Sequence, residues 1–309
     1  MINKQQLSKI GIGTWGIGGF TEPDPQNDDE KQIDAIVYSI NKGINYIETV
    51  YMYAKGKTVD LVSKAVKKSK VEREKIFITL SVYQSDAKTT KEVEQRLNSF
   101  LETFGMDYVD SLQLTMGLVH DLGLDSVAEF VDGLIKQGKT RYTSLANSNP
   151  DYLKKYHEAF KEKLFAHECC FNFEVRENET MGITEYAKQN GILNVIYQPL
   201  RRNRTANRNW PLLVKLAKKY GKTQNQILLN WIVSKGFFPL VKSSTKAHID
   251  ENLASFDFQI KPEDLKRLNE FKINYQAPKI DWFGTGNGVP IHQIPNIFDE
   301  EYEKQSKII

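Results

Sequence analysis

One short segment of the sequence combines the residue types that bind an anion. Lys242, Ser243 and Ser244 lie at the end of a predicted strand, beside the start of a predicted helix. A lysine ammonium, two hydroxyls and the free N–H groups of a helix N-terminus together form a natural phosphate site. Tyr197 ends another predicted strand and can stack on a flat aromatic ligand. These residues predict a site for a small-molecule ligand that carries an anionic group.

The cysteines and histidines predict no metal centre. Cys169 and Cys170 are neighbours, and neighbouring side chains of a strand point to opposite faces, which disfavours a disulfide or shared metal. We expect both to be small buried apolar residues. Four histidines have no other ligand-type residue at a spacing that would form a metal site, and we assign them no function: His120, His157, His167 and His292.

Composition narrows the classes of partner. The chain has 42 basic and 39 acidic residues and a formal net charge of +3, so no global field favours nucleic acid or an anionic membrane surface. No apolar stretch approaches the roughly 18 residues that a membrane span needs. Met1 to Gln6 is polar and does not read as a secretory signal. We therefore expect a cytoplasmic protein with no nucleic-acid or membrane partner.

Short β-rich segments alternate with longer amphipathic helical patterns nearly from end to end, which is typical of parallel strands joined by crossover helices. Eight such segments are found, and eight βα units close a barrel of about this size. The crossover before the last strand contains two helical patterns. The sequence thus predicts a single-domain (β/α)8 TIM barrel, with strands at residues 10–14, 46–49, 76–81, 109–115, 143–146, 168–171, 195–197 and 239–242.

The last part of the chain breaks this pattern. We divide the sequence into a barrel, residues 1–272, and a C-terminal tail, residues 273–309. The tail is rich in glycine and proline and is too long for an ordinary loop. It also carries apolar residues that need burial, so we expect it to fold over the barrel and its mouth: Trp282, Phe283, Ile291, Ile294, Ile297 and Phe298.

Four stretches occur in an order and at a spacing shared with one enzyme family: residues 10–16, 43–53, 138–147 and 239–253. They resemble, in turn, the first strand, the catalytic segment, the fifth strand and the adenosine 2′-phosphate loop of the aldo-keto reductases. Together they span roughly residues 7–272. The resemblance implies the same barrel, NADP(H) as coenzyme and a small-molecule substrate.

The resemblance also shows which catalytic residues differ. The family reduces carbonyls with a tyrosine acid, a lysine paired to an aspartate, and a histidine. Tyr53 matches the tyrosine, whereas Glu48 replaces the aspartate, Ser81 the lysine and Thr115 the histidine. Without a nearby ammonium, we expect the pKa of Tyr53 to lie near its ordinary value of about 10, which makes it a poor acid at neutral pH.

The coenzyme positions are only partly preserved. Asn147 follows Ala146, where the family has a serine and asparagine, and Glu168 replaces a glutamine. His248 stands where an arginine often stacks on adenine. The basic run 201–204 either approaches the pyrophosphate or forms a solvated loop. The resemblance assigns coenzyme contacts to Asn147, Glu168, Tyr197, Lys242, Ser243, Ser244, His248, Glu251 and Asn252.

Three functions follow from this altered site. The main prediction takes Glu48, stranded without a cation and with a raised pKa, as a general base that removes a proton from carbon. Ser81, Thr115 or Tyr53 would donate hydrogen bonds in a Kemp-type elimination on a small, flat, apolar or aromatic substrate. Because the changes concentrate in one layer, they are typical of a repurposed or redesigned pocket. The NADP(H) coenzyme would not be required.

Two alternatives remain. One is a divergent NADP(H)-dependent aldo-keto reductase that uses Tyr53 as its acid. The other is a non-catalytic barrel that binds a nucleotide or a partner. In the last case Glu48 would be structural, hydrogen-bonded to the backbone or to Tyr53.

Overall fold

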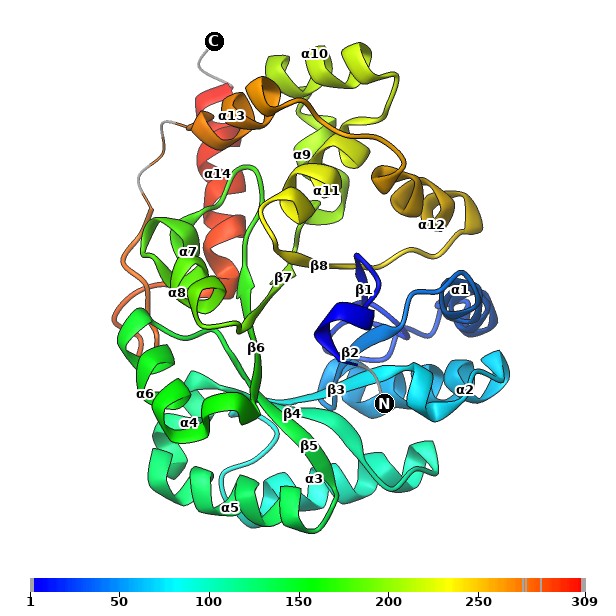
Figure 1. Cartoon of the computed structure of the whole chain (residues 1–309), viewed down its shortest axis with the longest axis vertical. Helices are drawn as coiled ribbons and strands as arrows, with labels where there is room; N and C mark the ends of the chain where they lie inside the picture. The colour runs from blue at the N-terminus through cyan, green and yellow to red at the C-terminus, as the bar shows by residue number, and fades with distance from the viewer. Residues whose placement is uncertain (1–2, 274, 276, 284, 307–309) are drawn as a thin grey trace.

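The computed structural model contains a closed barrel of eight parallel strands, each paired with its neighbours in chain order (Figure 1). It describes residues 3–273, 275, 277–283 and 285–306, with side chains up to residue 300. The predicted (β/α)8 barrel is therefore confirmed. The strands are β1 (Gly11–Gly13), β2 (Tyr46–Val50), β3 (Phe77–Val82), β4 (Val109–Thr115), β5 (Thr140–Ala146), β6 (Leu164–Cys170), β7 (Leu193–Tyr197) and β8 (Phe238–Val241).

Helices surround the ring of strands (Figure 1), and side-chain caps fix several of their starts. Thr89, Asn149 and Thr223 each accept a hydrogen bond from a backbone N–H of the first turn, as helix N-caps do. The α-helices of the barrel are α1 (Asp29–Asn41), α2 (Lys57–Ser69), α3 (Thr90–Phe104), α4 (Met116–Leu122), α5 (Leu124–Lys136), α6 (Pro150–Phe160), α7 (Glu177–Thr180), α8 (Ile183–Gln189), α9 (Arg204–Asn207), α10 (Pro211–Tyr220), α11 (Gln224–Ser234), α12 (Lys246–Leu253) and α13 (Pro262–Glu270).

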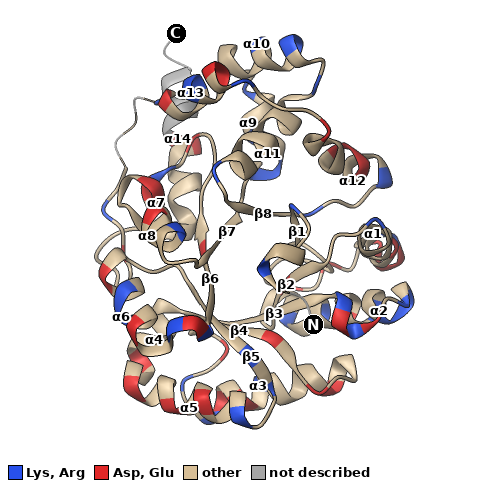
Figure 2. Cartoon of the chain, in the orientation of Figure 1, with Lys and Arg blue, Asp and Glu red and all other residues tan. Residues whose placement is uncertain are grey.

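The outer charges are mixed in sign. In Figure 2, basic and acidic residues occur together on α2, α3 and α5. A surface that mixes both signs does not produce the single-sign field that a nucleic-acid face needs. No described helix has the length and apolar character needed to cross a membrane.

Aromatic side chains fill the barrel near the N-terminal ends of its strands. The rings of Tyr46 and Phe77 stack with centroids 5.2 Å apart, Phe77 stacks on Phe165 at 4.3 Å, and Phe238 meets Tyr46 edge to face. Inward-facing residues alternate along a strand, so the inward residues that follow toward the C-terminal ends form a separate layer. That layer is polar, and it lies at the barrel end where the active sites of this fold occur.

The tail packs on the barrel through apolar contacts. Trp282 and Phe283 join the main core, and the ring of Phe283 lies 4.6 Å from that of His120, in α4. Ile294 and Phe298, in the final helix α14 (Ile294–Ser306), pack with buried side chains that include Cys170. Cys169 and Cys170 are both buried and unbridged, as predicted. The tail therefore lies against α4 and against the C-terminal end of β6.

Candidate active site and coenzyme site

Four buried side chains form a continuous hydrogen-bonded chain across the polar layer. The Ser81 hydroxyl donates to Glu48 Oε1 at 3.0 Å, and Gln113 Nε2 donates to Ser81 Oγ at 2.7 Å. The same Gln113 nitrogen donates to Glu168 Oε2 at 2.8 Å. We call Glu48, Ser81, Gln113 and Glu168 the carboxyl chain. Each of its members is at most 3 % exposed, and they come from β2, β3, β4 and β6.

The two carboxyl groups of this chain have no cationic partner. Within the described residues, no lysine, arginine or histidine nitrogen lies within 4.0 Å of either one. Burial raises the pKa of Glu168 to about 7, against a hydrogen bond from Gln113. Burial and the charge of Glu168 raise the pKa of Glu48 well above its usual range, in the direction expected from the sequence. Glu48 therefore keeps its proton to higher pH than an ordinary carboxyl group does.

Tyr53 begins a short 3₁₀ turn (Tyr53–Gly56) and is half-buried beside Trp15, with ring centroids 4.7 Å apart. Tyr83 is its hydrogen-bonding partner. Burial, with the charges of Tyr83 and Glu48, raises the pKa of Tyr53 well above its usual value. The sequence-based expectation of a pKa near 10 is wrong, because it considered only the missing lysine and not the desolvation of the hydroxyl.

Thr115 has a different environment from the other three predicted catalytic residues. It ends β4 and caps α4, with its hydroxyl oxygen accepting a hydrogen bond from the Leu118 N–H at 3.4 Å. No described hydrogen bond joins Thr115 to the carboxyl chain. Gln113, two residues earlier on the same strand, makes that connection instead. Sequence reasoning missed Gln113, although its alternation with Thr115 places both on the inward face of β4.

Three predicted coenzyme residues lie together at the ends of β5, β6 and β7. The Tyr197 hydroxyl donates to Asn147 Oδ1 at 2.8 Å, and the Asn147 N–H donates to the backbone carbonyl of Glu168 at 3.0 Å. Asn147 has a positive φ of 56°, a conformation that asparagine tolerates better than most residues. Tyr197 and Asn147 are half-buried, and their mutual hydrogen bond lies beside the carboxyl chain.

The predicted phosphate loop is organised around Lys242. Lys242 Nζ donates to Ser244 Oγ at 2.8 Å, and Asn252 Nδ2 donates to Ser243 Oγ at 3.0 Å. Partial desolvation and the nearby charge of Arg202 lower the pKa of Lys242. Lys242 and Arg202 are both exposed, and neither has an acidic partner within ion-pair distance among the described residues. The result is a pair of uncompensated positive charges at the end of β8.

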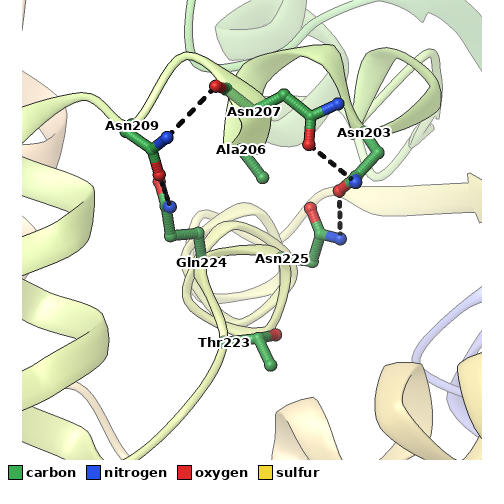
Figure 3. A pocket seen from close by; sticks show the side chains of 7 residues that line it. All are labelled: Asn203, Ala206, Asn207, Asn209, Thr223, Gln224 and Asn225. Carbon is green, nitrogen blue, oxygen red and sulfur yellow. Dashed lines mark hydrogen bonds between the residues drawn. The ribbon is translucent and has the colours of Figure 1, made fainter.

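A polar pocket of about 370 Å³ opens near this loop (Figure 3). Asn225 Nδ2 donates to Asn203 Oδ1 at 2.7 Å, and Gln224 Nε2 donates to Asn209 Oδ1 at 2.9 Å. The side-chain amide oxygens Gln224 Oε1 and Asn225 Oδ1 are buried, and no described group hydrogen-bonds to them. Sequence reasoning missed this pocket, whose signal is the clustering of carboxamides. It is lined by Asn203, Ala206, Asn207, Asn209, Thr223, Gln224 and Asn225.

The pocket connects to the remaining predicted coenzyme residues. The Thr223 hydroxyl, on its rim, donates to Glu251 Oε1 at 2.6 Å. Asn252 is buried beside Ser243, whereas His248 is exposed on α12, in the turn that Thr245 caps. Glu251 and Asn252 thus link the pocket to the Lys242 loop, and His248 lies on the outer side of the same helix.

The basic run 201–204 divides between two environments. Arg201 is buried and forms ion pairs with Glu174 and Asp299, and Arg204 also pairs with Asp299. Arg202 instead extends toward Lys242, with its guanidinium 4.6 Å from the centre of the Phe20 ring. The run is therefore neither a uniform anion site nor a solvated loop, because Arg201 and Arg204 are bound to the C-terminal helix.

Comparison with known proteins identifies the family. The chain belongs to the Aldo/keto reductase family, whose sequence model matches residues 9–273. It is 24% identical over 278 residues to 9,11-endoperoxide prostaglandin H2 reductase of Trypanosoma cruzi, covering 87% of this chain and 89% of that protein. It is 25% identical over 288 residues to the NADPH-dependent alpha-keto amide reductase of Saccharomyces cerevisiae, covering 89% of this chain and 90% of that protein.

Solved structures agree on the fold. A thermostable aldo-keto reductase, solved with the inhibitor epalrestat, aligns with a TM-score of 0.77 and 28% identity over 85% of this chain and 94% of that one. A Bombyx mori aldo-keto reductase in complex with NADP aligns with a TM-score of 0.72 and 21% identity. The alignment covers 92% of this chain and 94% of that one. The predicted resemblance is confirmed at the level of the family. These relatives are named as reductases, which favours the reductase alternative over the predicted elimination.

Proposed function

We propose that this protein is an NADP(H)-dependent reductase of small carbonyl compounds. The observation that carries the proposal is the uncompensated pair Lys242 and Arg202, set beside a carboxamide-lined pocket at the end of β8. Two like charges held near one another without an acidic partner are relieved by a bound anion. The family membership supports the same coenzyme, since a yeast relative is named as NADPH-dependent.

The residues present fit such a coenzyme. Lys242, Ser243 and Ser244 supply an ammonium and two hydroxyls for a phosphate group. The unpartnered carbonyl oxygens of Gln224 and Asn225 are acceptors for an amino group of a base. Glu251 and Thr223 connect the two sites. This arrangement favours a phosphorylated adenosine in the pocket, with its phosphate on the Lys242 loop.

The other end of the coenzyme would lie at the barrel mouth. Asn147 and Tyr197 are joined by a hydrogen bond there and offer an amide and a ring to a flat amide-bearing group. When bound, NADPH supplies the hydride. Tyr53, half-buried beside Trp15, offers its hydroxyl as a hydrogen-bond donor to the substrate oxygen. Because its pKa is raised rather than lowered, we expect reduction that relies on Tyr53 alone to be slow.

The elimination predicted from the sequence is the second candidate. The observation that favours it is Glu48, which is buried with a raised pKa and accepts a hydrogen bond from Ser81. The same raised pKa means that Glu48 becomes a base only at higher pH than an ordinary carboxyl group, so base catalysis would rise with pH. A coenzyme-free elimination assay checks this. A rate that is equal in wild type and Glu48→Gln would rule out Glu48 as the base.

Coenzyme binding tests the main proposal. We expect NADPH, followed by fluorescence titration, to bind more tightly than NADH, and Lys242→Ala to weaken NADPH binding by roughly 10- to 100-fold. Lys266→Ala is the matched control, because Lys266 is an exposed lysine of α13 whose ion-pair partner among the described residues is Glu270. Equal NADPH affinity in wild type and Lys242→Ala would contradict the proposal. NADPH binding without oxidation by any of a panel of aldehydes would support the non-catalytic alternative.

A further inference from the structure

The hydrogen bonds of the carboxyl chain can be counted donor by donor. Gln113 Nε2 has two hydrogens, which point to Ser81 Oγ and Glu168 Oε2. Ser81 has one, which points to Glu48 Oε1. Each carboxyl group therefore receives a single neutral hydrogen bond within this chain. Glu48 Oε2 and Glu168 Oε1 receive none from its members, and Gln113 Oε1 is buried without a partner.

This supply of donors is too small for two buried carboxylates. Both side chains are 3 % exposed, and no described cation lies within ion-pair distance. A buried carboxylate without a cation is strongly disfavoured, and a second one nearby is disfavoured further by repulsion. The two groups titrate as a coupled pair, and the pair releases its protons at higher pH than isolated carboxyl groups do. The Ser81 and Gln113 hydrogen bonds leave Glu48 Oε2 and Glu168 Oε1 as the oxygens open to a proton.

The proton is stored in the same cluster as the tyrosines of the barrel mouth. Tyr53 follows β2 by three residues, and Glu48 lies within that strand. The charge of Glu48 contributes to the raised pKa of both Tyr53 and Tyr83. A carboxylic acid is ordinarily a much stronger acid than a phenol, and burial raises the pKa of the Tyr53 phenol further, so a carboxyl group is the better proton donor.

We propose that Glu48 is the proton donor of the reduction, a neutral carboxylic acid kept protonated by Glu168 in the same buried chain. The proposal rests on the proposed function for its reductant, NADPH. Hydride forms the new C–H bond at the carbonyl carbon as the C=O π bond breaks. The Glu48 proton forms the O–H bond, which leaves the Glu48 carboxylate and oxidised coenzyme, and water then reprotonates Glu48. Glu168 is a positioning residue that acts through Glu48.

Infrared spectroscopy of the free protein tests the proton store without activity or coenzyme. At neutral pH we expect a protonated-carboxyl C=O band that shifts in D2O and loses the Glu48 contribution in Glu48→Gln, which leaves only the part that titrates with Glu168 at about pH 7. In Glu168→Gln the band should persist but titrate at lower pH, because the repelling charge is gone. Glu263→Gln, on the exposed face of α13, is the control and should leave the band unchanged. Absence of the band from the wild-type spectrum would overturn the proposal.

The pH dependence of NADPH-dependent reduction tests the catalytic role. Above the pKa of Glu48, we expect kcat to fall about tenfold per pH unit. Glu168→Gln should move this fall to lower pH, and Tyr53→Phe should leave its position in place. Glu48→Gln should lose at least about 100-fold in kcat while its affinity for NADPH stays within twofold. A Glu48→Gln variant with wild-type kcat would overturn the proposal, whereas loss of NADPH binding in wild type would instead refute the proposed function.

Discussion

Two buried clusters in this barrel each contain two carboxyl groups, but only one of them contains cations. In the carboxyl chain, Glu48 and Glu168 share neutral donors from Ser81 and Gln113. In the second, which we call the arginine cluster, Glu174 and Asp299 bind Arg201 and Arg208. Both clusters are removed from water, so the partner groups rather than burial set the charge state of the acids.

The pKa values follow this difference. Burial acts to raise the pKa of Asp299, but hydrogen bonds and charge from Arg208 and Arg201 together lower it below its usual value. Glu48, which is more deeply buried than Asp299, has a pKa raised well above its usual value. Asp299 is therefore an anion at neutral pH, and it ties α14 to the segments after β6 and β7. Cations thus hold a buried acid in its charged form, whereas their absence favours the protonated form.

The largest expected effect comes from breaking the arginine cluster. The side chain of Arg201 is 1% exposed, and that of Glu174 is 0%. Arg201→Met would leave Glu174 and Asp299 with an uncompensated buried charge. We expect the free energy of unfolding, measured by urea denaturation, to fall by about 3–5 kcal/mol.

Arg204→Met is the matched control for that variant. Arg204 also pairs with Asp299, but its side chain is 50% exposed. Its loss should cost no more than about 1 kcal/mol. Equal effects of the two substitutions would show that burial does not distinguish these arginines.

Removing a charge from the carboxyl chain should stabilise the protein at high pH, whereas removing one from the arginine cluster destabilises it. The folded-state pKa of Glu168 is about 7 against an ordinary value of 4.5, so its stabilising contribution is complete below 4.5 and is lost as pH rises through about 7. A shift of roughly 2.5 units, at about 1.36 kcal/mol per unit, corresponds to about 3 kcal/mol. Glu168→Gln should therefore unfold at higher urea than wild type at about pH 8, and show no such gain at about pH 4.

Asp299→Asn tests the arginine cluster, where the stabilising contribution of the acid has the reverse pH dependence. Because the folded-state pKa of Asp299 is lowered, its contribution is present above its unfolded pKa and is lost as pH falls through the folded value. At neutral pH we expect a loss of about 2 kcal/mol in unfolding free energy. The loss should shrink as the pH falls through this lowered folded-state pKa. A loss that stays constant with pH would mean that the charge of Asp299 is not what stabilises α14.

The smallest change concerns Ser81. Ser81→Ala removes the single hydrogen bond to Glu48 and should cost about 1 kcal/mol of stability. Because that bond acts to lower the pKa of Glu48, its loss should move the fall of kcat to higher pH. A shift to lower pH would indicate that Ser81 does not donate to the ionised carboxylate.

The sequence predicted the scaffold better than the partnerships inside it. Alternating apolar patterns located all eight strands, and the predicted bounds of β4 agree with the structure. The family resemblance singled out Glu48 and Ser81 as catalytic positions and Glu168 as a coenzyme contact, and hydrogen bonds join all three through Gln113. Gln113 was missed because it acquires its role only when barrel closure brings β3, β4 and β6 together. Local patterns do not encode such contacts between distant strands.

The arginine cluster shows the same limit at longer range. Nothing near residues 201–204 indicates that Asp299, almost a hundred residues later, neutralises Arg201 and Arg204. Thr115 lies where the resemblance places it, at the end of β4, but the helix that follows takes its hydroxyl oxygen as a cap. The pairing of Asp299 with these arginines depends on α14, and the capping by Thr115 depends on α4. The hydrophobic pattern alone located neither helix.

The central claim is that coenzyme is held at the end of β8 while the carboxyl chain supplies the proton. Single-turnover oxidation of bound NADPH by an aldehyde, followed by absorbance in wild type, Lys242→Ala and Glu48→Gln, tests both parts. We expect rapid oxidation by wild type, weakened NADPH binding by Lys242→Ala, and tight NADPH binding with at least about 100-fold slower oxidation by Glu48→Gln. Oxidation by Glu48→Gln at the wild-type rate, or equal NADPH affinity in wild type and Lys242→Ala, would contradict these two roles.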